Sequence, residues 1–202
     1  MEISQVIQNL ELNNFEVYPV KDIKEARLCF MEIFDRLKPS SVSYGDSETF
    51  FETDLRSWLN EHATDYIDTF EKGIIFREKI RRMRLALTVD LFITGSNAIT
   101  EKGQLVNLDM IGNRIGGINF GPKHVVLFVK TEKICTDLET AMDYIRNIVA
   151  PRNARRHDDI KTPCKVSGKC EDCGSPTRIC NQWLITEKSH PKGRIKIILI
   201  DK

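Results

Sequence analysis

Strand-like and helix-like segments alternate along this sequence, and that alternation limits the possible folds more than any other feature. The run Val125–Val129 is apolar throughout, which is typical of a strand buried on both faces in a parallel sheet. Apolar residues recur with helical spacing over residues 3–10 and again over residues 22–37. The alternation predicts an α/β fold with a largely parallel sheet flanked by helices.

The remaining elements are expected at intervals along the chain. Residues 15–20 alternate like a strand, and Pro19, which has no N–H to donate to a neighbouring strand, makes this run either an edge strand or a linker. Other strands are expected at 41–44, 66–67, 90–94 and 194–200, with a hairpin over 98–100 and 104–107. Helices are expected from Ser47 to about residue 59, over 77–87 and 112–117, and from a capping box at Thr136 and Glu139 to a stop at Pro151.

Length and patterning predict one domain over residues 1–202. Its first part, up to about residue 40, is mainly helical. The amino-acid composition changes after Pro151, and residues from about 160 to 182 are polar and rich in cysteine. We expect this stretch to be an insertion, with the last strand returning to the main sheet.

Charge and hydropathy exclude two classes of partner. Lysine and arginine number 30 and aspartate and glutamate 29, so a bulk electrostatic role on nucleic acid has no support. The longest apolar run has five residues, whereas a membrane span needs roughly 20. The first residues carry neither a basic segment nor an apolar one of the secretory type. We therefore expect a cytoplasmic protein that binds no membrane and no nucleic acid.

Three polar, glycine-bearing loops follow expected strands, at the sheet edge where α/β proteins bind ligands. A small anion could be held there by backbone N–H groups and by Arg114, which can bind a carboxylate or phosphate with two hydrogen bonds. Asp109 is the candidate acid or base. The candidate ligand-binding residues are Gly45, Ser47, Thr94, Gly95, Ser96, Asn97, Asn107, Gly112, Asn113 and Arg114. The alternative is that the glycines and serines only form turns and helix caps.

Four of the six cysteines lie close together as Cys164, Cys170, Cys173 and Cys180. In a chain without an export signal, clustered thiols indicate a metal or redox site rather than disulfides. Four thiolates could hold zinc or an iron–sulfur cluster, and the spacing does not choose between them. Free or paired thiols in a tight loop are the alternative.

Two basic runs are less specific. The first, over residues 77–84, has basic residues on more than one helical face and is typical of a solvated surface. The second contains Arg152, Arg155, Arg156 and His157. It suits the carboxyl end of a helix, where positive charge is favourable, and could also serve an anionic ligand.

Several of these motifs together resemble a known family, the lactate-utilisation (LUD) domain family, also catalogued as DUF162, which includes lactate utilisation protein C. The similar segments are 43–47, 90–109, 112–114, 120–123, 137–139 and 150–154. In the first of them Asp46 stands where a second glycine is expected. The cysteine loop is similar to that of small stand-alone members. The resemblance implies a fold like those of ribose-5-phosphate isomerase, glucosamine-6-phosphate deaminase and CoA transferases (the NagB/RpiA/CoA transferase-like class).

The resemblance also implies a link to the oxidation of L-lactate to pyruvate or to related organic-acid redox metabolism, alongside iron–sulfur oxidoreductase subunits. The other expected partners are a small anionic metabolite and a second copy of the chain in a homodimer. Whether the chain is itself an enzyme is open. One alternative is a non-catalytic module that binds a metabolite or assembles subunits, with a structural metal knuckle.

A sugar-phosphate isomerase-like enzyme is the other alternative. The segment after residue 94 is distantly similar to methylthioribose-1-phosphate isomerases and to regulatory subunits of translation initiation factor 2B. Asn97 falls where the isomerase pattern has an aspartate. A carboxamide cannot act as a general base, so the isomerase mechanism would have to differ here.

Overall fold

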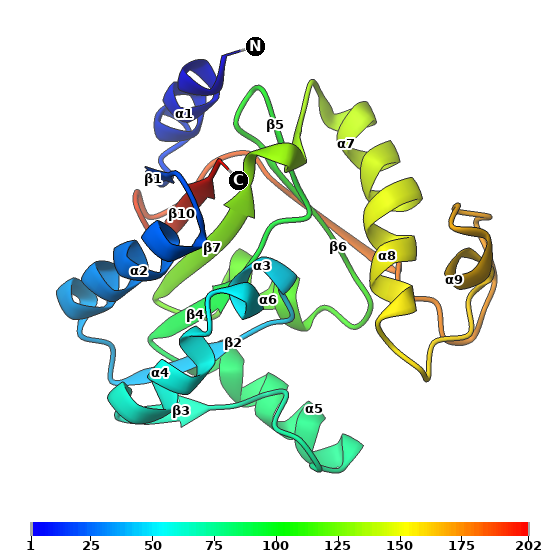
Figure 1. Ribbon diagram of the computed structural model, residues 1–202, viewed down its shortest axis with the longest axis horizontal. Helices are drawn as coiled ribbons and strands as arrows, with labels where there is room; N and C mark the ends of the chain where they lie inside the picture. Colours follow the sequence, from blue (N-terminus) through cyan, green and yellow to red (C-terminus); the bar gives the residue numbers. More distant parts are fainter. Residues whose placement is uncertain (1, 202) are drawn as a thin grey trace.

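A computed structural model describes residues 2–201 and places a six-stranded parallel sheet at the centre of the molecule (Figure 1). The strand order is β1 (Glu16–Val20), β10 (Ile195–Ile200), β7 (His124–Lys130), β4 (Leu91–Thr94), β2 (Ser41–Tyr44) and β3 (Asp65–Ile67). Each neighbouring pair is parallel. The predicted α/β fold with a largely parallel sheet is therefore confirmed. The last strand joins this sheet between β1 and β7, as expected.

Helices α2 (Ile23–Leu37), α3 (Glu48–Glu52) and α4 (Leu55–His62) cover one face of the sheet, where an aromatic core forms. The ring centroids of Phe30 and Phe50 lie 5.8 and 5.7 Å from that of Phe128 on β7. The single helix expected after Ser47 is in fact two. Asp54 adopts a left-handed conformation (φ +53°), and this interrupts the helical hydrogen bonding between α3 and α4.

The other face is covered by α1 (Ile3–Leu12), α6 (Asn113–Asn119) and a second sheet. That sheet has the order β8 (Ile134–Cys135), β5 (Ala98–Thr100), β6 (Leu105–Asp109) and β9 (Gln182–Thr186). The predicted hairpin is confirmed as the antiparallel pair β5–β6. The sequence did not predict β9, which pairs antiparallel with β6.

A helical column packs on the outer side of the second sheet and corrects two expectations. The N-cap of α7 (Leu138–Tyr144) is Asp137, whose carboxylate accepts a hydrogen bond from the N–H of Thr140 at 2.8 Å, so the cap is not Thr136. Pro151 does not end the helix. The column continues through a π-helical turn, η3 (Ile145–Val149), into α8 (Ala150–Arg155) (Figure 1). The π-helical turn directly before Pro151 accommodates this residue, which has no N–H to continue the regular helical hydrogen bonding.

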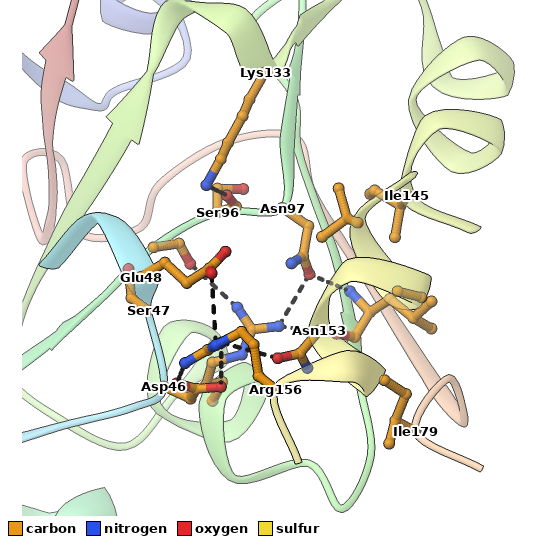
Figure 2. Close-up of a pocket in the computed structure, with 15 residues that line it drawn as sticks. Asp46, Ser47, Glu48, Ser96, Asn97, Lys133, Ile145, Asn153, Arg156 and Ile179 are labelled. Carbon is orange, nitrogen blue, oxygen red and sulfur yellow. Dashed lines mark hydrogen bonds and ion pairs between the residues drawn. The ribbon is translucent and has the colours of Figure 1, made fainter. Parts of the chain in front are cut away.

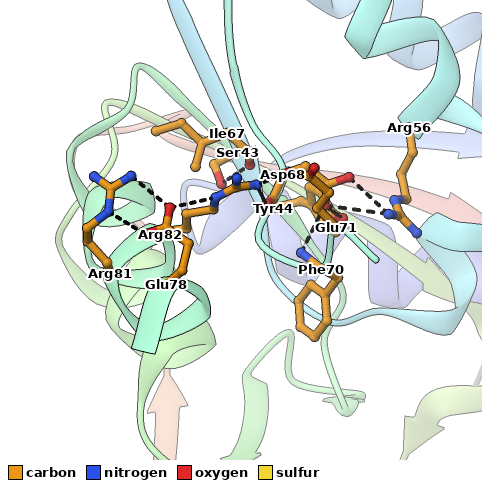
Figure 3. A network of polar contacts seen from close by, with 10 residues as sticks. All are labelled: Ser43, Tyr44, Arg56, Ile67, Asp68, Phe70, Glu71, Glu78, Arg81 and Arg82. Atoms are coloured by element: carbon orange, nitrogen blue, oxygen red, sulfur yellow. Dashed lines mark hydrogen bonds and ion pairs between the residues drawn. The ribbon is translucent and has the colours of Figure 1, made fainter. Parts of the chain in front are cut away.

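Helix α5 (Phe76–Leu85) is tied to the sheet through Asp68 (Figure 3). The Asp68 carboxylate accepts hydrogen bonds from the Tyr44 hydroxyl and from the N–H of Phe70, and it pairs with Arg56 at 3.1 Å. Its backbone oxygen accepts a hydrogen bond from Arg82 Nη1 on α5, at 2.8 Å. Burial, followed by the bond to Asp68, raises the pKa of Tyr44 well above its usual value, so the hydroxyl remains a donor.

Across residues 2–201, every helix is too short or too polar to cross a lipid bilayer.

Candidate functional site

A small pocket, about 90 Å³ in volume, lies where β2, β4 and β7 end (Figure 2). Two of its walls come from the loops after β2 and β4, and a third comes from η3 and α8. Adjacent parallel strands end at one edge of the sheet, which is why residues distant in sequence meet here. Ile145 and Ile179 give the pocket an apolar side, and the remaining surface is mostly polar.

Glycine lets the two loops approach closely. A Cβ atom on Gly95 would lie 2.7 Å from Ser47 Oγ, and one on Gly45 would lie 2.6 Å from Arg114 Cγ. Either distance is shorter than any normal carbon contact. Both glycines are therefore needed for the close packing of the loops that follow β2 and β4 and of the start of α6.

The structure brings the three predicted loops together. Arg114 Nη2 donates to Asn97 Oδ1 at 2.9 Å and to the backbone oxygen of Leu108 at 2.8 Å. Asn97 Oδ1 also accepts the N–H of Leu108, at 2.9 Å, so this oxygen is fully used within the protein. Ser47, Gly95, Ser96, Asn97 and Arg114 all line the pocket.

Asp109 serves mainly as an anchor for the start of α6. Its carboxylate accepts backbone N–H groups from Gly112, Arg114 and Ile115, at 3.4, 3.0 and 3.2 Å. It lines a cleft beside the pocket rather than the pocket itself. An acid or base role for Asp109 stays a prediction.

Three other predicted residues support the loops from behind. Thr94 and Asn107 are fully buried, and Asn107 Oδ1 accepts the N–H of Asn97 at 3.1 Å. Thr94 Oγ1 and Asn107 Nδ2 have no hydrogen-bond partner within the described chain. Gly112 is the N-cap of α6 and has φ +88°, a conformation that favours glycine. Asn113 lines the neighbouring cleft.

Lys133 is a pocket residue that sequence reasoning missed. It lies in η2 (Thr131–Lys133), directly after β7, and its Nζ points into the pocket at 3.4 Å from the backbone oxygen of Ser96 (Figure 2). Within residues 2–201, no carboxylate lies at ion-pair distance from this ammonium group, although Glu132 and Glu48 attract it from farther away. Burial, and after it repulsion from Arg114, lowers the pKa of Lys133 to about 8. A lone lysine after a strand carries no recognisable motif, so its position became visible only in the fold.

Arg156 was noted in the second basic run, for which binding of an anionic ligand was the second option after a role at a helix end. It reaches from the end of α8 to Asp46, and the two form hydrogen bonds of 3.1 and 2.9 Å. Glu48 lies 3.5 Å from Arg156 and 3.1 Å from Arg152. Burial tends to raise the pKa of Asp46, but His157, 3.8 Å away, and the hydrogen bonds from Arg156 outweigh it and lower that pKa to about 2. Asp46 is therefore ionised at neutral pH.

The four clustered cysteines do not converge on one point. Cys164 lies on α9 (Pro163–Ser167) and packs against Ala154 and Ile160, whereas Cys180 packs against a different apolar cluster, as Trp183 on β9 does. All four are free thiols, and residues 2–201 contain no group of three or more histidine, cysteine or acidic side chains placed to hold a metal ion. This arrangement does not fit a four-cysteine zinc or iron–sulfur site, and the metal site stays a prediction.

Comparisons with known proteins identify the family of this chain. A sequence model of the LUD domain matches residues 3–200. A crystal structure of a DUF162 family protein from Deinococcus radiodurans, at 1.70 Å resolution, has a similar fold, with a TM-score of 0.51 and 11% sequence identity over 99% of each chain. No curated protein matches the chain significantly. Because the family match covers almost its whole length, the chain belongs to the LUD domain family.

Proposed function

We propose that this LUD domain chain binds a small organic anion in the pocket at the ends of β2, β4 and β7. We further propose that it takes part in organic-acid metabolism linked to the oxidation of L-lactate to pyruvate. Membership of the LUD family supports the metabolic link. The side chains of the pocket support the binding of an anion.

The observation that carries the proposal is the unpaired ammonium group of Lys133. Arg156 is neutralised by Asp46 and Glu48, and Arg114 lies 3.7 Å from Asp109. Lys133 has only the backbone oxygen of Ser96 within hydrogen-bond distance. Since a partly buried charge is costly unless it is paired, a carboxylate or phosphate is the natural partner for this ammonium group.

The other polar groups suit orientation of such an anion. Ser47 and Asn153 line the pocket close to the three cations. The serine, lysine, arginine and asparagine side chains there can bind and position a substrate, but they cannot accept electrons from it. We therefore propose that lactate oxidation, which removes two electrons, uses a redox centre in iron–sulfur partner subunits.

A thermal-shift series tests the proposal. Lactate, pyruvate, sugar phosphates and CoA would be added to the full chain, and a ligand at 100 times its dissociation constant should stabilise it by about 2.7 kcal/mol. Lys133→Met should abolish the shift, whereas Lys102→Met, an exposed lysine on the β5–β6 turn, should keep it.

The ligand that gives the shift separates the alternatives. Lactate or pyruvate supports the proposal, while a sugar phosphate alone would favour an isomerase-like role. A panel in which no anion shifts the melting temperature, or a shift that survives Lys133→Met, contradicts the proposed site.

A further inference from the structure

A larger cleft, of about 230 Å³, adjoins the pocket. The two cavities share five lining residues, Asp46, Leu108, Arg114, Asn153 and Ile179. Arg114 therefore stands at their junction, with its guanidinium directed to the loop after β4. A ligand whose charged end lies beside Lys133 would extend past Arg114 into this cleft.

The walls of the cleft are mainly apolar, in contrast to those of the pocket. One wall is the start of α5, and the opposite wall is the loop between β6 and α6. Its large apolar side chains are unusually exposed: Phe76 is 76% exposed, Ile111 48% and Met110 38%. Single exposed apolar residues are common on protein surfaces, but a group that lines one concave site indicates a binding surface.

The α5 wall is held in place by polar contacts rather than by a deep core (Figure 3). Arg82 donates to the backbone oxygen of Asp68 at 2.8 Å and pairs with Glu71, which precedes the helix. Asp68 also accepts the N–H of Phe70, and the ammonium of Lys79 lies 4.6 Å from the centre of the Phe70 ring. The cleft is therefore formed before any ligand binds, which reduces the entropic cost of binding.

We propose that this cleft holds the apolar body of an organic acid whose carboxylate lies in the pocket. The ligand is then a 2-hydroxy or 2-oxo acid with an aromatic or long aliphatic side chain, larger than lactate. The pocket, at about 90 Å³, has room for the charged head, and the cleft supplies the apolar surface for the rest. This inference rests on the proposed function, because it needs the anion to bind beside Lys133.

The test compares two acids that share the same head group. Isothermal titration of the full chain with lactate and with 3-phenyllactate gives their two dissociation constants. Burial of the phenyl ring should make 3-phenyllactate bind at least about tenfold more tightly. The double variant Phe76→Ala, Ile111→Ala should bring this ratio close to one. Phe120→Ala removes a ring that is 86% exposed and lies outside the cleft, and it should leave the ratio unchanged.

The outcomes separate this inference from the proposed function. If lactate binds and 3-phenyllactate binds no better, the cleft proposal is wrong and the anion site stands. A tenfold preference that survives the double variant also overturns the cleft proposal. Should neither acid bind, both proposals fail. If the double variant loses its cooperative melting transition, Phe76→Ala alone carries the test, since this exposed side chain contributes little to the core.

Discussion

Arg156 holds the carboxylate of Asp46 with two hydrogen bonds, of 3.1 and 2.9 Å, although 110 residues separate them in the sequence. Arg156 follows α8 and Asp46 follows β2, so the pair fastens the helical column to the loop at the mouth of the pocket. Glu48, the first residue of α3, reinforces this contact at 3.5 Å from Arg156. The pocket is thus closed on one side by an ion pair rather than by apolar packing.

Asp46→Asn is expected to lower the free energy of unfolding by about 1 kcal/mol at pH 7, because the ion pair is only partly shielded from solvent. Folding lowers the pKa of Asp46 from 3.8 to about 2. The stabilisation is therefore present above pH 3.8 and is lost as the pH falls to about 2. Urea denaturation of both proteins across this range measures it. Asp35→Asn, an exposed carboxylate on α2, is the control and should change little. A difference that persists unchanged at pH 2 would contradict the assignment.

Lys133→Met should stabilise the ligand-free protein while abolishing anion binding. Burial lowers the pKa of Lys133 from 10.5 to about 8, which means that the folded state disfavours the charged ammonium. Removing the charge should raise the free energy of unfolding by about 1 kcal/mol at pH 7, a value discounted for partial solvent screening. Such a gain in stability with a loss of function is typical of a binding site. Equal or lower stability of the variant would argue against a partly buried, unpaired ammonium group.

Deprotonation of Lys133 should have opposite effects on two quantities, the free energy of unfolding and the affinity for the anion. Between pH 8 and 10.5 the unfolded chain keeps a proton on Lys133 that the folded protein releases, so this residue makes the free energy of unfolding rise with pH. Affinity for the anion should fall over the same range, because the ammonium of the free pocket is lost above about pH 8. Titrations at pH 7 and pH 9.5 measure the second effect, and an affinity independent of pH would exclude Lys133 as the anion's partner.

Sequence periodicity predicted the main sheet well, because local pattern and burial agree there. Val125–Val129 is apolar at every position and lies fully buried in β7, at the centre of the sheet. β9 was missed because its partner, β6, lies more than 70 residues earlier and no local pattern marks the pairing. The prediction that the helix ends at Pro151 was wrong for a related reason, since it too used only the local sequence. A π-helical turn before the proline lets the helix continue, and that turn depends on packing against the second sheet.

In the candidate site, too, features that follow from local sequence were predictable, whereas those that depend on tertiary contacts were not. Loops that follow predicted strands, such as Gly95–Asn97, could be assigned from the sequence because parallel strands end at one edge. Lys133 and Arg156 could not, because their roles arise from tertiary contacts with Ser96 and Asp46. Asp109 was predicted as an acid or base, whereas its three hydrogen bonds from backbone N–H groups follow from the turn into α6 and could not be read from the sequence.

Gly45→Ala should damage the site more than the fold. Its Cβ would lie 2.6 Å from Arg114 Cγ and 3.1 Å from Thr94 Oγ1, so the arginine side chain must shift. We expect a loss of about 1–3 kcal/mol in stability and a clear loss of anion affinity. Gly174→Ala is the matched control, since no atom lies within 4 Å of its added methyl group. Wild-type affinity in Gly45→Ala would show that the position of Arg114 does not matter for binding.

The four-cysteine metal site is the prediction that would most change this picture. Because the thiols are dispersed in this structure, a metal could bind only if the segment from Cys164 to Cys180 rearranged. Protein purified without oxygen should then contain iron and sulfide or zinc, measured by elemental analysis and an absorption spectrum, and Cys173→Ser should lose it. Cys29→Ser is the control. That thiol lies on α2, and burial, with Glu32 nearby, raises its pKa to about 11. If the wild type is metal-free and melts at the same temperature with and without added zinc or iron, the cysteines form no metal site.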